Sequence, residues 1–316
     1  MVPKRTIGVV LACALVLLGL SSPAIGAKGG YTRLVVFGDS LSDPGNAAVA
    51  IREVEVAPFD LIPDAPYARG GLHFSNGETW AEQLAAMLGL ELSAGPALRV
   101  PGVFSNYALG AARARAAGSF DLTTQVTLFL QDLASQAPAD ALYVVFVGSN
   151  DVRDALDALT VDPSGVTSIT ILGEALGAIQ QDIVTLATAG ARHFLVANVP
   201  DLSLVPAVIL AGPAAQGAAL YLATNFNTGL AAGLAGLEVA YPELQIAALD
   251  TFGLLRELVG PPSVFGNVSD PCITPGTRVS PYCTRPDVYL FWDGIHPTRA
   301  GHGAVAQRAL EVLLQP

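Results

Sequence analysis

The stretch VVFGDSLSDPGN, from Val35 to Asn46, decides the fold, because an apolar, β-branched run stops there at a turn. Leu34–Phe37 is typical of a buried strand, and the small, polar, turn-forming residues begin at Gly38-Asp39-Ser40. This position exposes the hydroxyl of Ser40 on a rigid edge, where it can act as a nucleophile. Taken alone, the serine is more typical of an N-cap, since Ser is among the commonest capping residues.

Further apolar, β-branched runs resemble the first one. They lie at Leu142–Val147, Phe194–Ala197 and Leu244–Leu249. Longer segments with helical spacing lie between them, and one of these, Trp80–Leu88, ends at Gly89 as a helix commonly does. Strands that alternate with helices predict an α/β fold with a parallel sheet covered on both faces.

Two of the predicted strands end in polar clusters, at Gly38-Asp39-Ser40 and at Gly148-Ser149-Asn150-Asp151. Parallel sheets carry their working residues on the loops that follow the carboxyl ends of the strands, so we expect both clusters on one rim. Residues Arg52 to Gly70 contain three prolines and predict a long irregular excursion. Such an excursion either walls a substrate pocket or is a plain surface loop.

The first 27 residues are typical of a secretory signal peptide. Lys4 and Arg5 precede an apolar run from Ile7 to Leu20 and then small residues up to Ala27. We expect cleavage after Ala27, with Ala24 as the alternative, and a mature chain, residues 28–316, that forms one domain without an integral membrane segment. Losing this leader moves the formal net charge from −11 to −13, which disfavours nucleic acid as a partner.

The mature chain holds two cysteines, Cys272 and Cys283, in a proline-rich region. An exported chain meets an oxidising compartment, so the pair is expected to form a disulfide. A zinc site is the rival interpretation, but ten residues separate the two cysteines and no histidine pair lies nearby.

A serine nucleophile needs a base, and the spacing around His296 fits that role better than the spacing around the other histidines, His73, His193 and His302. In FWDGIHPTRAGH, Asp293 precedes His296 by three positions, so its carboxylate can reach Nδ1 and leave Nε2 for a nucleophile. The alternative is that Asp293 only organises the start of the last helix.

The chemistry also needs hydrogen-bond donors for the negative charge that develops on a carbonyl oxygen. Asn150 offers a side-chain amide at a strand end, and backbone N–H groups near Ser40 and Gly110-Ala111 can add two more. The sequence contains no G-x-S-x-G elbow, no G-x-x-x-x-G-K-[ST] loop and no H-E-x-x-H helix. Hydrolases with the elbow, P-loop enzymes and the commonest metalloproteases are therefore disfavoured.

Four blocks in order resemble the GDSL, or SGNH, family of lipolytic serine hydrolases. They are GDSLSDPGN at 38–46, SNYALGAARA at 105–114, GSND at 148–151 and DGIHP at 293–297, and the segment HFSNGETWAEQLA at 73–85 also resembles a stretch common in the family. The agreement extends from Leu34 to about His302. It implies a flavodoxin-like three-layer α/β/α sandwich with a mainly parallel five-stranded sheet, and ester hydrolysis without a metal or other cofactor.

The resemblance also implies a role for each matching residue. Ser40 is then the nucleophile and an oxyanion donor through its N–H, Asn150 donates through its side chain, and Asp293 orients His296, the general base. The family's oxyanion glycine falls at Ala111, after Gly110, and an alanine can donate there only if the local φ and ψ suit a residue with a Cβ.

The sequence therefore predicts an exported esterase or lipase that acts on a small-molecule or lipid ester and is secreted or periplasmic. The long match of the first block favours the phospholipase-like branch of the family. The alternatives are a carbohydrate acetyl esterase on the same core and a binding protein that kept the fold without turnover. In this context Asp39 and Asp43 are expected to fix the turn around Ser40 rather than to form a glycosidase-like acid pair.

Overall fold

The computed structural model describes residues 30–51, 73–273 and 283–315. The predicted leader, cleavage site and excursion from Arg52 to Gly70 lie outside these ranges. The elements are β1(Arg33–Gly38), α1(Asn46–Ile51), α2(Trp80–Leu88), η2(Glu91–Ala94), α3(Leu122–Asp132), β2(Ala141–Phe146), α4(Ser149–Ala158), α5(Val166–Ala189), β3(His193–Ala197), η3(Leu202–Leu204), α6(Pro206–Ala211), α7(Pro213–Ala240), β4(Gln245–Leu249), α8(Thr251–Val259), β5(Asn267–Pro271), η4(Pro286–Val288), β6(Tyr289–Phe291) and α9(Arg299–Leu313).

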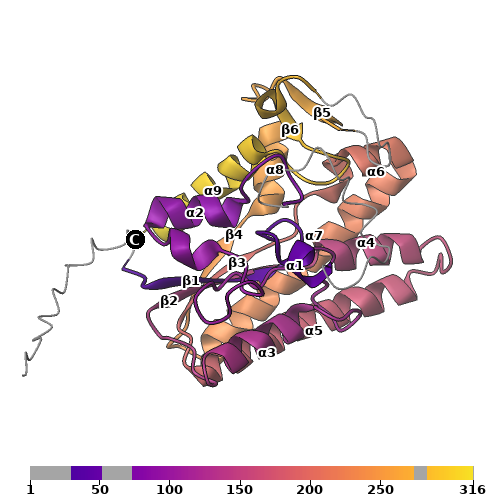
Figure 1. Ribbon diagram of the computed structural model, residues 1–316. Helices are drawn as coiled ribbons and strands as arrows, with labels where there is room; N and C mark the ends of the chain where they lie inside the picture. Colours follow the sequence, from indigo (N-terminus) through magenta and orange to yellow (C-terminus); the bar gives the residue numbers. More distant parts are fainter. Residues whose placement is uncertain (1–29, 52–72, 274–282, 316) are drawn as a thin grey trace, which may run out of the picture.

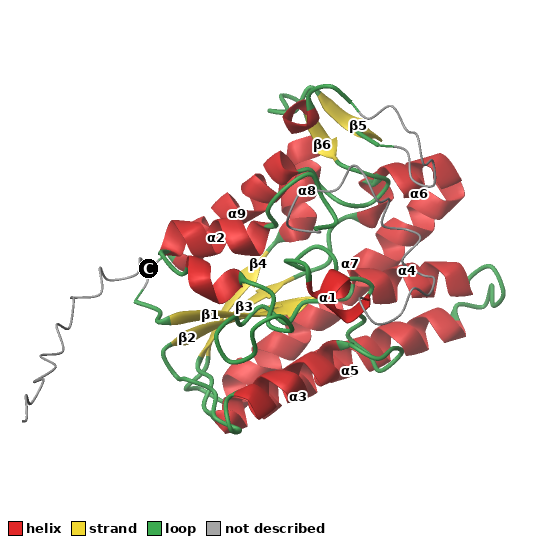
Figure 2. Cartoon of the chain, in the orientation of Figure 1, coloured by secondary structure: helices red, strands yellow, loops and turns green. Residues whose placement is uncertain are grey.

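The main sheet of the described residues is parallel and has the order β1-β2-β3-β4. Its strands coincide, within a residue or so at each end, with the apolar runs read from the sequence. Every residue of β2 is buried, as expected of a parallel strand that is covered on both faces. Figure 2 shows the strands side by side with helices on either face.

The expectation of five strands is wrong for the described residues, in which the sheet has four. A fifth position is nevertheless filled beside β1, where Val36 donates to Ser105 and accepts from Tyr107, and Leu109 donates to Gly38. Among the described residues, a single bridge, between Val36 and Asn106, pairs this segment with β1, and a second joins Asn106 to Pro96. This segment is irregular because the Asn106 side chain binds backbone groups itself: its Oδ1 accepts from the nearby Ala108 N–H, and its Nδ2 donates to the carbonyl of Ser42, 64 positions away in the sequence.

Helices cover the two faces of the sheet (Figure 1). On one face, side chains of β1, β2 and β3 pack with α3, α4, α5 and α7 around fully buried rings, among them Phe37, Phe129, Tyr143 and Phe226. On the other face, Trp80 and Leu84 of α2 and Ala306 of α9 pack on the opposite side chains of the strands. The predicted three-layer α/β/α arrangement is confirmed.

The predicted helix Trp80–Leu88 is confirmed as α2, and its ends follow the expected physical rules. Thr79 caps its start in a capping box with Glu82. Gly89 ends it at φ 75°, a left-handed conformation that favours glycine.

A smaller sheet of β5 and β6 lies near α6 and α8, at the carboxyl edge of the main sheet (Figure 1). The disulfide between Cys272 and Cys283, which the sequence predicted, lies beside this sheet. Cys272 and Ile273 donate to the carbonyls of Phe291 and Trp292, immediately before Asp293. The disulfide region is thus tied to the loop that carries His296. Within the described ranges, no helix has both the length and the apolarity that a membrane crossing requires.

Candidate active site

Folding brings Ser40 and His296 together from opposite ends of the described chain. His296 Nε2 lies 2.8 Å from Ser40 Oγ, and His296 Nδ1 lies 2.7 Å from Asp293 Oδ2. Asp293 and His296 are buried, with exposed fractions of 4% and 8%. The three side chains form a hydrogen-bonded row, in which the carboxylate can hold the imidazole with Nε2 toward the hydroxyl.

The Asp293 carboxylate also fixes the loop that carries His296. Its Oδ1 accepts from the N–H of Ile295 at 2.8 Å and from the N–H of His296 at 2.7 Å. Burial acts to raise the pKa of Asp293, but the adjacent His296 and these hydrogen bonds outweigh it and hold the pKa below the ordinary value. The carboxyl is therefore ionised, as an orienting partner of an imidazole must be.

Two buried aspartates hold the turn at Ser40, as the sequence predicted. Asp39 accepts from the N–H of Leu41 at 3.0 Å, and burial raises its pKa to about 6. Asp43 accepts from four backbone N–H groups, those of Gly45, Asn46, Ala47 and Gly110, and burial raises its pKa to about 6 as well. Both carboxylates act on the backbone of the turn.

Gly110 is a poor candidate for an oxyanion donor, which corrects that part of the sequence prediction. Its N–H donates to Asp43 Oδ2 at 2.8 Å and is therefore used inside the protein. The next residue, Ala111, is exposed and has φ 66°, in the left-handed region. Within the described ranges, the N–H groups of Ala111 and Ser40 donate no hydrogen bond, so both are available to a substrate oxygen.

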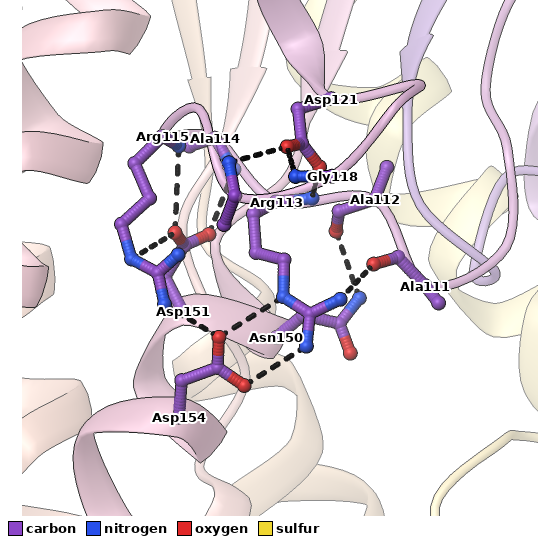
Figure 3. A network of polar contacts seen from close by, with 11 residues as sticks. Ala111, Ala112, Arg113, Ala114, Arg115, Gly118, Asp121, Asn150, Asp151 and Asp154 are labelled. Atoms are coloured by element: carbon purple, nitrogen blue, oxygen red, sulfur yellow. Dashed lines mark hydrogen bonds and ion pairs between the residues drawn. The ribbon is translucent and has the colours of Figure 1, made fainter. Parts of the chain in front are cut away.

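Asn150 is the second residue of α4, two positions after Gly148, and is 7% exposed. One hydrogen of Nδ2 is donated to the carbonyl of Ala112 at 2.9 Å, which leaves the second hydrogen for another acceptor. Figure 3 shows this amide beside the Ala111-Ala112 backbone. The side chain of Asn150 is therefore tied to the segment that carries Ala111, the other candidate donor.

A network of charged groups fixes the 111–118 segment (Figure 3). Asp154 of α4 accepts from Arg113 at two 3.0 Å contacts and from Arg115 at 2.6 Å. Asp151 of the GSND block accepts from the N–H of Ala114 at 2.8 Å, and burial raises its pKa to about 6. Arg113 and Arg115, at the end of the second block and just after it, and Asp151 and Asp154, at the end of the third block and just after it, therefore join the two regions.

Sequence reasoning assigned no role to Phe74 or Gln125, which the structure places next to the site. The Phe74 ring lies 5.3 Å from the His296 ring, centroid to centroid, and a Cβ at Gly110 would overlap it. The Gln125 side chain accepts from the Gly38 N–H at 2.9 Å and donates to the Gly38 carbonyl at 2.8 Å. Phe74 lies in the quoted 73–85 segment, whereas nothing in the sequence around Gln125 signals its contact.

Two of the other three histidines bond elsewhere, and the third, His302, lines the pocket without contacting Ser40. His73 contacts Glu82 at 2.9 Å, and His193 contacts Gln245 at 3.1 Å. His302 is 2% exposed, and burial lowers its pKa to about 3, so it stays neutral. Among the described histidines, His296 is the one that contacts Ser40. The described residues also contain no group of three or more histidines, cysteines or acids arranged to hold a metal ion.

A pocket of about 290 Å³ opens beside Ser40, Asn150 and His296. Its wall is mainly aliphatic and is drawn from the loop after β1 and from α4, η3, α6, α8 and α9. Representative wall residues are Leu41, Leu156, Leu202, Val208, Leu254 and Val305. The three candidate catalytic and donor side chains therefore face an apolar cavity.

A serine hydroxyl, an imidazole and a carboxylate in series at the carboxyl edge of a parallel sheet indicate a hydrolase, and the chain is a carboxylic ester hydrolase. The chain belongs to the GDSL-like Lipase/Acylhydrolase family, whose sequence profile matches residues 34–309. This match confirms the resemblance carried by the four sequence blocks.

Curated relatives include GDSL esterase/lipases of Arabidopsis thaliana. One is 26% identical over 309 residues, with 88% of each chain covered, and another is 28% identical over 313 residues, with 86% of this chain and 84% of the relative covered. The thermolabile hemolysin of Vibrio parahaemolyticus is 25% identical over 302 residues, which cover 88% of this chain and 63% of the relative.

Among solved structures, a catalytic mutant of an acetylxylan esterase from Geobacillus stearothermophilus has a similar fold. The TM-score is 0.51 at 14% identity, with 92% of this chain and 97% of that chain covered. At this identity the likeness supports the fold alone.

Proposed function

We propose that this chain is an exported, metal-independent serine esterase or lipase in which Ser40, His296 and Asp293 form the catalytic triad. The row of contacts from Ser40 Oγ to His296 Nε2 and from His296 Nδ1 to Asp293 Oδ2, at 2.8 and 2.7 Å, carries the proposal. Such a row performs proton transfer and supports a nucleophile, and a binding protein has no need of it.

In the proposed mechanism, His296 Nε2 takes the Ser40 proton while Oγ attacks the ester carbonyl. The tetrahedral oxyanion receives hydrogen bonds from the N–H of Ser40 and the Nδ2 of Asn150, and we propose the Ala111 N–H as a third donor. His296 then protonates the leaving alcohol. Water, deprotonated by the same imidazole, releases the acid from the acyl-enzyme.

The pocket favours an ester with an apolar acyl chain. Its wall is mainly aliphatic, and burying each methylene of a bound chain there contributes about 0.8 kcal/mol. A carbohydrate offers hydroxyls to such a wall with few partners to satisfy them, so it gains less. We therefore place a lipid or other long-chain ester ahead of an acetylated sugar as the substrate.

Export is part of the proposal and rests on two features. Residues 1–27 have the pattern of a signal peptide, and Cys272 and Cys283 form a disulfide of the kind that persists in oxidising compartments. We propose that residues 28–316 are the mature domain and that it is secreted or periplasmic. N-terminal sequencing of the exported protein tests this, with Lys28 as the expected first residue.

A fluorophosphonate probe with a mass-spectrometric readout tests the catalytic assignment. The wild-type protein should carry one adduct on Ser40, and Ser40→Ala should carry none. An unmodified wild-type protein would instead favour the binding-protein alternative. A series of p-nitrophenyl esters from acetate to palmitate, run beside an acetylated xylo-oligosaccharide, tests the substrate class. We expect kcat/KM to rise with chain length beyond acetate, and a preference for the sugar would contradict the proposed substrate.

A further inference from the structure

The short helix α6 is apolar on both its inner and its outer side. Its six residues, Pro206–Ala211, read PAVILA and include no side chain that can form a hydrogen bond. Leu210 is 90% exposed and Ile209 is 37% exposed. A single exposed apolar side chain is ordinary on a protein surface, so the exposure of Leu210 matters here because it lies on a helix that has no polar residue and also lines the pocket.

The inner side of α6 belongs to the candidate active site. Ala207, Val208 and Ala211 line the pocket that also contains Ser40 and His296. The N–H of Ala207 donates to the carbonyl of Gly294 at 2.9 Å, between Asp293 and His296 in the sequence. The helix is thus fastened to the catalytic loop and forms part of the wall of the pocket.

The outer side of α6 therefore continues the apolar surface of the pocket onto the outside of the protein. We call the pair Ile209 and Leu210 the α6 face; neither residue lines the pocket. Ile295, which does line the pocket, is 39% exposed beside Gly294. Figure 1 shows α6 at the periphery of the molecule, adjacent to β5.

We propose that the α6 face docks this enzyme on a neutral or zwitterionic lipid surface and so presents the pocket to esters held in that surface. This inference rests on the proposed function, because an apolar docking face at the pocket is useful when the substrate is itself embedded in lipid. The formal net charge, −11 for the full sequence and −13 without Lys4 and Arg5 of the leader, opposes approach to anionic lipid, so apolar contact rather than charge attraction supplies the binding.

Vesicle binding measured with the Ser40→Ala protein tests the proposal without hydrolysis. We expect co-sedimentation with phosphatidylcholine vesicles, and weaker binding when phosphatidylglycerol is added at low salt. Leu210→Asp should weaken the apparent lipid affinity by at least about tenfold, because a carboxylate replaces a side chain that enters the interface. Leu210→Trp should preserve or tighten binding, since tryptophan favours the membrane interface.

Val239→Asp is the matched control. Val239 is 86% exposed and lies at the far end of α7, which starts two residues after α6 ends. It should leave vesicle binding within about twofold of the parent, so that a general effect of added charge is separated from loss of the α6 face.

Ester turnover by the protein that retains Ser40 separates this inference from the proposed function. Leu210→Asp should hydrolyse soluble p-nitrophenyl butyrate within about twofold of wild type and lose at least about fivefold on an emulsified long-chain ester. Wild-type turnover of the butyrate tests the proposed function, and its absence would overturn that function first. If Leu210→Asp lowers butyrate turnover because the variant misfolds, vesicle binding by Leu210→Ser is compared with that by Leu210→Trp, and the docking proposal requires weaker binding by Leu210→Ser.

Three results would overturn the docking proposal while soluble-ester turnover stays intact. They are no vesicle binding by the Ser40→Ala protein, equal binding by its Leu210→Asp variant, and tighter binding to anionic vesicles. A fourth is a dimer that Leu210→Asp converts to a monomer in light scattering, because the α6 face would then cover a second copy of the chain.

Discussion

Asp43 and Gly110 lie 67 positions apart in the sequence and are joined by a 2.8 Å hydrogen bond from the Gly110 N–H to Asp43 Oδ2. The same carboxylate accepts from the N–H groups of Gly45, Asn46 and Ala47. One buried side chain therefore holds both the turn that carries Ser40 and the segment that carries Ala111. This places the nucleophile and a candidate oxyanion donor in a fixed relation.

Replacing Asp43 by alanine should leave four N–H groups without their acceptor, three of them in the turn after Ser40. We expect a loss of about 3–5 kcal/mol in the free energy of unfolding, since each buried unpaired group costs about 1–3 kcal/mol and some will find water. Urea unfolding followed by circular dichroism measures it. Asp140→Ala, at an exposed aspartate, is the control. Equal stability of the two variants would contradict the structural role given to Asp43.

Gly110 and Ala111 should respond in opposite directions to exchange of glycine and alanine. Gly110→Ala places a Cβ against the ring of Phe74, which lies next to His296, so both stability and ester turnover should fall. Ala111→Gly relieves a left-handed conformation that costs a residue with a Cβ about 1 kcal/mol, offset in part by the greater freedom of glycine in the unfolded chain.

Differential scanning calorimetry and turnover of a soluble ester check this pair. We expect a slightly higher Tm and activity within about twofold of wild type for Ala111→Gly, since the proposed donor is a backbone N–H. A stable, active Gly110→Ala protein would show that Phe74 moves aside freely and would remove it from the site.

The parts of the fold that depend on local sequence were predictable. Strands β1 to β4 are apolar, β-branched runs, and α2 has a capping box and a C-terminal glycine, which act within a few residues. The proximity of Ser40 and His296 was expected from the family resemblance and from the rule that working residues gather at the carboxyl edge. Neither the local elements nor the proximity of Ser40 and His296 requires knowledge of how the side chains pack.

What the sequence missed depends on contacts between distant residues. The Asn106 side chain donates to the carbonyl of Ser42, 64 positions away, and the fifth position of the sheet is an irregular segment rather than a strand. The use of the Gly110 N–H by Asp43 is a tertiary contact with no local pattern. The same holds for Gln125, which lies 87 positions from Gly38.

Gln125→Leu should therefore damage both stability and catalysis. The buried amide pairs with the N–H and the carbonyl of Gly38, two residues before Ser40, and also donates to the carbonyl of Phe120. Leucine would leave the Gly38 N–H without its acceptor and the Phe120 carbonyl without this donor, while the Gly38 carbonyl would keep its bond from the Leu109 N–H. We expect a loss of about 2–4 kcal/mol in unfolding free energy and a fall in kcat/KM. Gln131→Leu on the exposed side of the same helix is the matched control and should change neither. An active, stable Gln125→Leu protein would show that the sheet alone positions Ser40.

Asp182 gives a pH-dependent stability change away from the site. Burial on α5 raises its pKa to about 6, although Thr123 Oγ1 donates to it at 2.8 Å. The folded protein then binds the proton more tightly than the unfolded chain. The contribution of Asp182 to the free energy of unfolding is therefore fully present below about pH 4 and is lost as pH rises through 6.

Asn does not titrate, so the stability of Asp182→Asn relative to wild type should improve by about 3 kcal/mol between pH 3.5 and pH 7.5, from a shift of about two pKa units. Urea unfolding at both pH values gives the difference. Asp140→Asn, at an exposed carboxyl, shows what the substitution alone does. A difference that does not change with pH would contradict the raised pKa.

The kcat/KM of Ser40→Ala on a soluble p-nitrophenyl ester tests the central claim most directly, with thermal unfolding to show that the variant is folded. If Ser40 is the nucleophile that His296 activates, the rate constant should fall by at least about 10⁴-fold. A folded Ser40→Ala protein that loses only a few-fold would show that another group performs the attack, and the proposed triad would be wrong.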